Sequence, residues 1–224
     1  MGSAISVKDI RKNFGTVEAL RGVSLEVDEG QKVVVIGPSG SGKSVLIRCI
    51  NGLETPDSGS ITVEGMDLSD RHVNSRALAR DVAMVFQSYN LYPHKTVLEN
   101  VTLAPIKVLK VPREQAERDG RAYLDRVGLS DKVDKYPDQL SGGQQQRVAI
   151  GRALMNAPAV VLADEPTGNL DSRNSHEIMA LLRESNKRFD QTLVVITHDE
   201  DIACMADRVI AIEDGRIASD ERRR

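Results

Sequence analysis

The sequence predicts an α/β fold built on a mostly parallel sheet, with an antiparallel β subdomain and an inserted helical subdomain. Two continuous apolar runs, "KVVVIG" and "TLVVITH", have the length of buried strands, and helical segments alternate with such runs along the chain. The stretch "SLEVDEG" alternates apolar and polar residues, which is typical of a strand with one exposed face. Buried strands that alternate with helices favour a parallel sheet covered on both faces.

The first half of the chain supplies strands and a helix before the pattern becomes mostly helical. A helix is expected from residue 43 to about residue 53, "GSITVEGMDL" is expected to form a hairpin that turns at Glu64 and Gly65, and "RDVAMVFQ" is expected to form a strand. Residues 96–138 are expected to be mostly helical. Two prolines in this segment indicate an interruption and a helix start, Pro105 and Pro112 respectively.

The second half returns to alternating strands and helices. After a helix that starts near Ser141, we expect a buried strand in "AVVLADEP", a helix over residues 175–189, and a strand pair in "RVIAIEDGRIA" that turns at Asp214 and Gly215. The charged tail "DERRR" is expected to be a frayed end. No internal repeat is visible, so we expect residues 1–224 to form a single domain.

The composition is that of a soluble protein with a substantial core. Hydrophobic residues make up 40% of the 224 residues, and the formal net charge of −3 gives no basic excess for binding nucleic acid. No apolar run approaches the roughly 20 residues of a membrane span, and no signal-peptide pattern is present. Cys49 and Cys204 lie in separate apolar segments, which predicts two inert core thiols in a reducing compartment. We expect a cytosolic protein.

A glycine-rich segment, "GPSGSGKS", connects an apolar strand with a helix. Its spacing of Gly, four residues and Gly-Lys-Ser is that of the phosphate-binding P-loop, and its context between strand and helix supports this interpretation over a plain glycine turn. We expect Lys43 to reach the β- and γ-phosphates of a nucleoside triphosphate and the Ser44 hydroxyl to ligate Mg²⁺. The sequence therefore predicts a P-loop NTPase core that binds phosphates through Gly37, Ser39, Gly40, Gly42, Lys43 and Ser44.

Two carboxylates and a histidine follow buried strands that belong to the same predicted sheet. Asp164 and Glu165 end the strand "VVLADEP", where ligands gather in open α/β sheets. Such a pair alone is usually a solvated turn, but beside a P-loop we expect Asp164 in the Mg²⁺ shell and Glu165 polarising the attacking water. His198 ends "TLVVITH" on the same side, which suits a γ-phosphate contact. The remaining histidines have no metal-ligand spacing and are expected at the surface: His72, His94 and His176.

A second helix start also has the composition of a phosphate site. In "DQLSGGQQQRVAIGRAL" the helix is entered through Ser141, Gly142 and Gly143, and a serine cap accounts for only the first of them. Because the P-loop already serves one nucleotide, a second such site is expected where a γ-phosphate is held between two copies of the protein.

The motifs in this order resemble the ATP-binding cassette (ABC) ATPases across essentially the whole chain. The stretch "LSGGQQQRVAIGRAL" is similar to the signature sequence of that family, and "DEPTGNLD" and His198 follow as they do there. The resemblance implies ATP hydrolysis with Mg²⁺ by two cassettes packed head to tail. It also implies that Ser141, Gly142, Gly143 and Gln144 contact the ATP of the partner copy.

The resemblance assigns roles to three further residues. Phe14 matches the aromatic residue that stacks on adenine, although an isolated Phe is more often part of a core. Gln87 resembles the glutamine that senses Mg²⁺ and the attacking water, and Asp171 matches the aspartate that crosses the dimer interface. The resemblance implies that residues from about 91 to 138 form the inserted helical subdomain. The family also implies transmembrane permease subunits at the cytoplasmic face of the cell membrane. They would dock near Leu91, Tyr92 and Pro93, for which a core or loop interpretation has nearly equal weight.

The branch of the family is less sharply indicated, because the two halves resemble different members. "VFQSYNLYPHKTVLENV" is similar to ATPases of polar amino acid importers, which we take as the leading interpretation. "ADEPTGNLDS" instead resembles lipoprotein-release, macrolide-export and cell-division cassettes, since those importers usually carry Ser-Ala at positions 168 and 169. A mosaic chain joined between the signature and "DEPTGNLD" is the third alternative. Relatives with a long coiled coil or tandem cassettes are excluded by the short spacing and the single P-loop.

Overall fold

The largest element of the fold is a sheet whose strand order is β10-β9-β3-β8-β7-β6. The computed structural model describes residues 2–70, 73–204 and 206–223. All neighbouring strands of this sheet are parallel except β10, which is antiparallel to β9, so the prediction of a mostly parallel sheet is confirmed. Its strands are β3 (Lys32–Ile36), β6 (Val82–Phe86), β7 (Val160–Asp164), β8 (Thr192–Ile196), β9 (Arg208–Glu213) and β10 (Arg216–Arg222).

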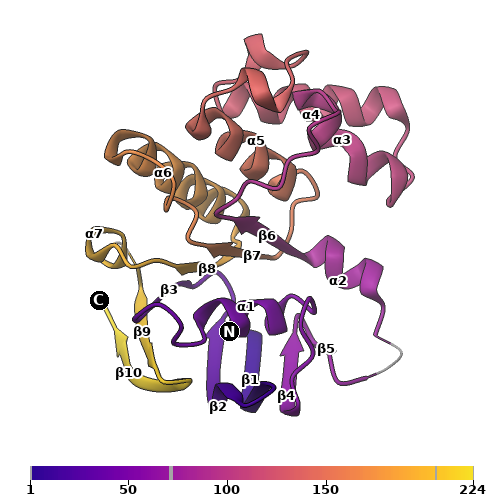
Figure 1. Cartoon of the computed structure of the whole chain (residues 1–224). Helices are drawn as coiled ribbons and strands as arrows, with labels where there is room; N and C mark the ends of the chain where they lie inside the picture. The colour runs from indigo at the N-terminus through magenta and orange to yellow at the C-terminus, as the bar shows by residue number, and fades with distance from the viewer. Residues whose placement is uncertain (1, 71–72, 205, 224) are drawn as a thin grey trace.

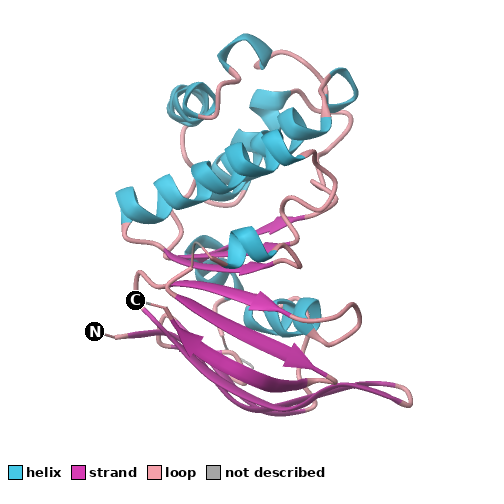
Figure 2. Ribbon diagram, turned by 90° about the vertical axis from the view of Figure 1, so that its left-hand side faces the viewer, coloured by secondary structure: helices cyan, strands magenta, loops and turns pink. Residues whose placement is uncertain are grey.

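A second, antiparallel sheet lies beside the first and has the order β2-β1-β4-β5 (Figure 2). Its turn at Glu64 and Gly65 was predicted, and both residues have a positive φ, of 48° and 73°, as a tight hairpin turn requires. The strands are β1 (Ser3–Phe14), β2 (Val17–Asp28), β4 (Ser58–Val63) and β5 (Met66–Asp67).

Two separate cores form because successive residues of a strand point to opposite faces of the sheet. On one face, Val33 and Val35 of β3 pack with α1 (Lys43–Ile50) and with the antiparallel sheet. On the other face, Val34 packs with helices α5 (Gly142–Leu154), α6 (Ser172–Phe189) and α7 (Glu200–Ala203). The prediction that both faces are covered is confirmed, but the antiparallel sheet shares one face with α1. A short helix, α2 (Ser75–Asp81), precedes β6.

The helical segment forms its own end of the molecule, away from β1, β2 and β4 (Figure 1). Its elements are α3 (Val97–Lys107), α4 (Arg113–Arg126), and the short 3₁₀ turns Ser130–Lys132 and Pro137–Gln139. A third core joins them to α5 through Val101, Leu124 and Val148. Pro112 directly precedes α4, as predicted, but Pro105 does not interrupt α3. It lies in the last turn, where one missing N–H donor costs a single bond and the helix continues to Lys107.

Two other sequence-based expectations are wrong. Residues 220–222 of the tail are not frayed, because they pair with β9 in β10 and the Asp220 carboxylate accepts two bonds of 2.6 Å from the Arg208 guanidinium. Cys49 is buried, and burial raises the pKa of its thiol to about 11, in agreement with an inert thiol. Cys204, however, is exposed just after α7. Ile202, Ala203 and Ala206 are buried, but the Cys204 side chain faces solvent, a difference that the local apolar pattern did not reveal.

Candidate functional site

The loop between β3 and α1 is the predicted P-loop, and two of its glycines are required by packing. Gly37 has φ 142° and Gly42 has φ 102°, values that L side chains rarely adopt. A Cβ at Gly37 would overlap the Ile212 carbonyl oxygen, and one at Gly42 would overlap the Ala19 carbonyl oxygen. The loop is therefore pressed against the backbone of β9 and β2. Its position at the start of α1 directs free N–H groups and the helix dipole towards a phosphate.

Lys43 places its ammonium group inside this loop. Its Nζ donates to the carbonyl oxygens of Gly37 and Pro38, each over 2.8 Å, and the residue is only 7% exposed. Burial lowers the pKa of Lys43, while the charges of Glu165 and Asp164 oppose that shift. Ser41 Oγ, 3.5 Å from Nζ, is a third and weaker acceptor, and the described residues give the ammonium no carboxylate partner, so a phosphate oxygen can replace the Ser41 contact.

Ser44 and Asp164 meet at the carboxyl end of β7. The Ser44 hydroxyl donates to Asp164 Oδ1 over 2.8 Å, and Gln87 follows β6, the strand that pairs with β7. Hydroxyl, carboxylate and amide oxygens are the hard ligands that Mg²⁺ prefers, so these three side chains fit the ion. The described residues contain no cluster of three His, Cys, Asp or Glu side chains able to hold a metal by themselves.

Glu165 and His198 form the second pair of the site. Glu165 Oε2 lies 2.7 Å from His198 Nδ1, and because an ionised carboxylate only accepts, this bond places a proton on Nδ1. Glu165 has φ 49°, in the left-handed region that non-glycine residues seldom occupy. Its N–H nevertheless donates to the Ile196 carbonyl of β8 over 3.0 Å, which fixes the turn. Strain of this kind is concentrated at functional sites.

One cleft of about 540 Å³ brings most of the predicted residues together. Its lining includes all ten residues of the P-loop, carboxylate, glutamine and histidine predictions: Gly37, Ser39, Gly40, Gly42, Lys43, Ser44, Gln87, Asp164, Glu165 and His198. Sequence reasoning missed Ala19, Val45 and Arg48, which also line it. Arg48 lies one helical turn after Ser44 on α1, so the helix period was a signal that could have found it.

Phe14 is not among the cleft-lining residues that the structure describes. It ends β1 with 47% of its surface exposed, and Lys12 Nζ lies 5.1 Å from the centre of its ring. The core interpretation of Phe14 is therefore wrong, because the ring is half open to solvent. An exposed ring beside a cation remains available for stacking, so the adenine contact stays a prediction.

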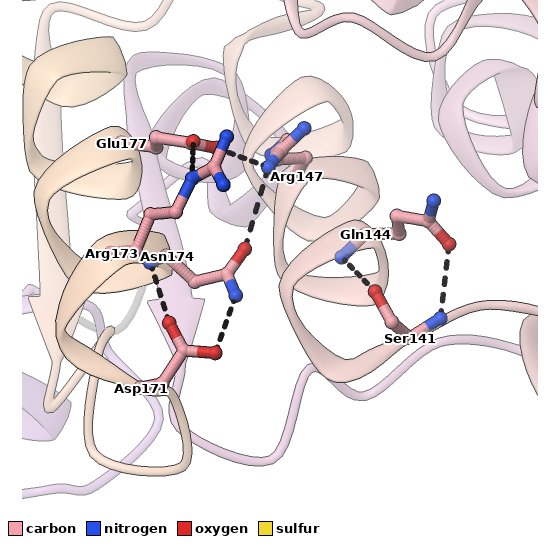
Figure 3. Close-up of polar contacts among 7 residues, drawn as sticks. All are labelled: Ser141, Gln144, Arg147, Asp171, Arg173, Asn174 and Glu177. Atoms are coloured by element: carbon pink, nitrogen blue, oxygen red, sulfur yellow. Dashed lines mark hydrogen bonds and ion pairs between the residues drawn. The ribbon is translucent and has the colours of Figure 1, made fainter.

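The signature residues lie at the start of α5, and within the described residues they do not line the cleft. Ser141 and Gln144 form a reciprocal cap: Gln144 N–H donates to Ser141 Oγ over 3.4 Å, and Ser141 N–H donates to Gln144 Oε1 over 3.0 Å (Figure 3). A Cβ at Gly142 would lie 2.8 Å from the Tyr89 hydroxyl oxygen, and one at Gly143 would overlap Asn174. Both glycines thus face groups of their own chain.

Asp171 is the N-cap of α6. Its carboxylate accepts from the N–H of Asn174 over 2.8 Å and from the side-chain amide of Asn174 over 2.9 Å (Figure 3). These bonds lower the pKa of Asp171, the backbone bond contributing most. The side chain is exposed at the turn that precedes α6.

Gln87 has a partner that sequence reasoning did not identify. Its Nε2 donates to Asn169 Oδ1 over 3.3 Å, and Asn169 Nδ2 donates to the Gln87 carbonyl over 3.1 Å. A Cβ at Gly168 would lie 2.7 Å from Gln87 Nε2. One signal in the sequence pointed to this contact, the departure of "GN" from the Ser-Ala of the importers. Asn169 lies 82 positions after Gln87, so no local pattern joins them.

A larger cavity, of about 770 Å³, lies between the helical segment and β6. Of the three residues expected at a permease contact, Tyr92 lines this cavity, Pro93 is exposed, and Leu91 packs on the third core. In the described part of the chain, no helix is both long and apolar enough to span a bilayer. His94 and His176 are exposed as predicted, and His72 lies outside the described residues.

Comparisons with known proteins agree on one family. The model described as "ABC transporter" matches residues 20–168. The glutamine transport ATP-binding protein GlnQ of Geobacillus stearothermophilus is 46% identical over 93% of this chain and 86% of its own length. The glutamate transport ATP-binding protein GluA of Corynebacterium glutamicum is 48% identical over 96% of this chain and 89% of its own length.

A similar solved structure is that of the cassette MJ0796 in a dimeric, post-hydrolysis state bound to ADP and Pi. Its TM-score is 0.88, with 36% sequence identity over 98% of this chain and 99% of that chain. The matches to GlnQ and GluA extend across both halves of the sequence, so they give no support to a mosaic joined after the signature.

Proposed function

Because this chain belongs to the family of ABC transporter ATP-binding proteins, and is an ATPase of that family, we propose that it powers the uptake of polar amino acids. The observation that carries the proposal is the likeness, over nearly its full length, to proteins named for glutamine and glutamate transport. The cleft is suited to ATP hydrolysis, since the P-loop, the residues that fit a cation, and a carboxylate with a histidine partner all line it.

We propose roles in phosphoryl transfer to water for six side chains of the cleft. Lys43 would neutralise charge on the β- and γ-phosphates, and Ser44, Asp164 and Gln87 would hold Mg²⁺. The ion, when bound, offsets the negative charge that develops on the phosphate oxygens. Glu165 would orient the attacking water, and His198 would hold the Glu165 carboxylate in place while its exposed side reaches the γ-phosphate. Phe14 would stack on adenine.

The start of α5 is proposed to act on a second copy of the chain. Ser141 and the amides of Gly142 and Gly143 lie outside the cleft of their own chain, so their phosphate site is complete only if another copy brings its ATP. Gln144 supports this site by capping, and Asp171 would meet the partner at the same interface. The dimeric form of MJ0796, bound to ADP and Pi, supports a dimer, and we propose that the pair is head to tail and forms on ATP.

The cavity between the helical segment and β6 is the proposed seat of a membrane permease. Its rim carries exposed apolar side chains, with Leu53 59%, Tyr92 44% and Val108 44% exposed. Apolar residues gathered at one cavity mark an interaction site better than apolar residues scattered singly. We propose that a permease segment fills this cavity, which places the chain at the cytoplasmic face of the cell membrane with residues 91–138 as its docking subdomain.

One observation favours a second candidate, a cassette of the lipoprotein-release, macrolide-export or cell-division kind. Gly168 and Asn169 stand where polar amino acid importers usually carry Ser-Ala, and Asn169 is engaged with Gln87. In a cell-division regulator the ATPase would transmit a shape change without moving a solute.

Affinity capture from detergent-solubilised membranes separates the two candidates. The Glu165→Gln variant, loaded with ATP, serves as bait, and a Lys43→Ala bait is the matched control that should not form the ATP state. Recovery of an amino acid permease, together with ATP-dependent uptake of labelled glutamine or glutamate in vesicles, supports the proposal. Recovery of an export or division permease in its place, without amino acid uptake, refutes it.

A further inference from the structure

One side chain, that of Asn174 in the first turn of α6, joins the turn of Asp171 to helix α5 (Figure 3). Its Nδ2 donates to Asp171 Oδ2 over 2.9 Å, and its Oδ1 accepts from Arg147 Nη2 of α5 over 3.4 Å. Arg147 also pairs with Glu177, one turn further along α6. The amide group of Asn174 therefore donates to Asp171, which caps α6, and accepts from Arg147 of α5.

Gly143 packs against the same amide. A Cβ on Gly143 would lie 2.7 Å from Asn174 Cγ and closer still to Oδ1, and Gly143 is buried. Gly143 is not among the glycines with a positive φ, so its backbone would accept alanine. The glycine is needed because Asn174 occupies the space that a methyl group would fill.

We propose that Asn174 is a positioning residue that ties Asp171 to the first turn of α5, and that Gly143 is glycine to admit it. Ser141 and Asp171 then face a second copy of the chain as one rigid unit, at a fixed separation. This purpose rests on the proposed dimer, in which both residues would be used at the same interface. The contact between Gly143 and Asn174 itself exists within one chain and does not depend on a dimer.

Removal of the Asn174 side chain is a selective change. In Asn174→Ala the backbone N–H of residue 174 still donates to Asp171 Oδ1, so the cap of α6 is kept. Only the bonds from the amide to Asp171 and Arg147 are lost. Arg173→Ala is the matched control, because it shortens the preceding side chain, which is 90% exposed and pairs at 3.4 Å with Glu177.

The first test is a melting cycle without nucleotide on the parent, Gly143→Ala, Asn174→Ala and the double variant. In the parental background the new methyl overlaps Asn174, so Gly143→Ala lowers the melting temperature. In the Asn174→Ala background the nearest remaining atom is Asn174 Cβ at 3.4 Å, an ordinary contact. There the same change is neutral or raises the melting temperature, because alanine is the better helix former. An equal decrease in both backgrounds overturns the inference.

The second test measures assembly in the Glu165→Gln background by light scattering over a range of protein concentrations with ATP. Asn174→Ala should raise the dimer dissociation constant about tenfold, the effect of one or two hydrogen bonds, and leave ATP binding to the single chain unchanged. Without the Glu165→Gln change, Asn174→Ala should raise by the same factor the protein concentration at which the turnover rate is half its maximum. The turnover rate per dimer should not change. A purely structural role would lower the melting temperature and leave both concentrations unchanged.

The control Arg173→Ala should dimerise like the parent. If Asn174→Ala also dimerises at the parental concentration, the positioning role is overturned. If the Glu165→Gln parent does not dimerise on ATP at all, the proposed function is wrong and the positioning role fails with it. The melting cycle still decides in that case whether Gly143 is reserved for Asn174.

Discussion

Replacing Glu165 by glutamine should stop hydrolysis while ATP remains bound. The substitution keeps the shape of the side chain and removes the carboxylate that would orient water, next to His198 Nδ1 at 2.7 Å. General-base groups contribute roughly a hundredfold to ten-thousandfold to a rate. We therefore expect turnover to fall about a thousandfold, which corresponds to about 4 kcal/mol of activation free energy.

The same structure predicts what the substitution leaves intact. The His198 side chain is 73% exposed, so its pair with Glu165 should contribute less than about 1 kcal/mol to the free energy of unfolding. The negative charge of Glu165 acts on Lys43 in the cleft, where it would also repel a triphosphate. Its removal should leave the affinity for ATP equal to that of the parent or higher.

The assay combines phosphate release at saturating Mg²⁺ and ATP with an ATP titration of each variant. Glu213→Gln is the control for loss of one carboxylate, because Glu213 is exposed at the end of β9 and is not among the described residues of the cleft. It should hydrolyse ATP like the parent. A Glu165→Gln protein with near-parental turnover, or one that loses ATP binding, would refute the role assigned to Glu165.

Three further predictions concern binding, assembly and stability. Lys43→Ala should weaken ATP binding about thirtyfold, since a charge-assisted phosphate contact is lost, and unchanged affinity in a titration would contradict this. Ser141→Arg should block the ATP-driven dimer of a turnover-deficient chain and spare binding of ATP to one copy; dimers in light scattering would count against it. Asp220→Asn should lower the free energy of unfolding by about 1 kcal/mol at pH 7, a small value because the carboxylate is 36% exposed. The Arg208 bonds hold the pKa of Asp220 below its usual 3.8, so this stabilisation is present above about pH 4 and is lost as the pH falls through the lower, folded-state pKa. Denaturant unfolding of the parent and of Asp220→Asn, at pH 7 and at a pH below the folded-state pKa of Asp220, measures this difference in the free energy of unfolding, with Glu221→Gln as control. The difference should disappear in acid. A difference that stays constant would show that the charge of Asp220 is not its source.

The cleft was predictable from the sequence because a parallel sheet gathers its carboxyl ends at one edge. Gln87, Glu165 and His198 each follow one of three neighbouring strands, β6, β7 and β8, so recognising the strands was sufficient to bring the side chains together. The P-loop needed only its own spacing and the strand and helix that flank it.

Contacts between polar side chains of separate elements were not predictable. The hydrogen bond of Gln87 with Asn169 and the packing of Asn174 against Gly143 each join two segments that are distant in the sequence. Such contacts depend on how the segments pack in three dimensions, which the local period of apolar residues does not encode. The charged residues at the end of β10 were expected to form a frayed end. Asp220 is instead held by Arg208, twelve positions earlier in the sequence, and the local charge pattern does not show this pairing. The charge pattern alone does not distinguish a paired edge strand from a free terminus.

The end of β6 lies between the larger cavity and the cleft. Phe86 lines the larger cavity, and Gln87, the next residue, lines the cleft. The following turn is held to α5, since Arg152 donates to the carbonyl oxygens of Asn90 over 2.6 Å and of Tyr89 over 2.9 Å. A permease segment that fills the cavity and shifts α5 would therefore move this turn and displace Gln87 within the cleft. The proposed permease seat and the proposed cation site therefore share the end of β6, and Arg152 holds the turn that follows it to α5.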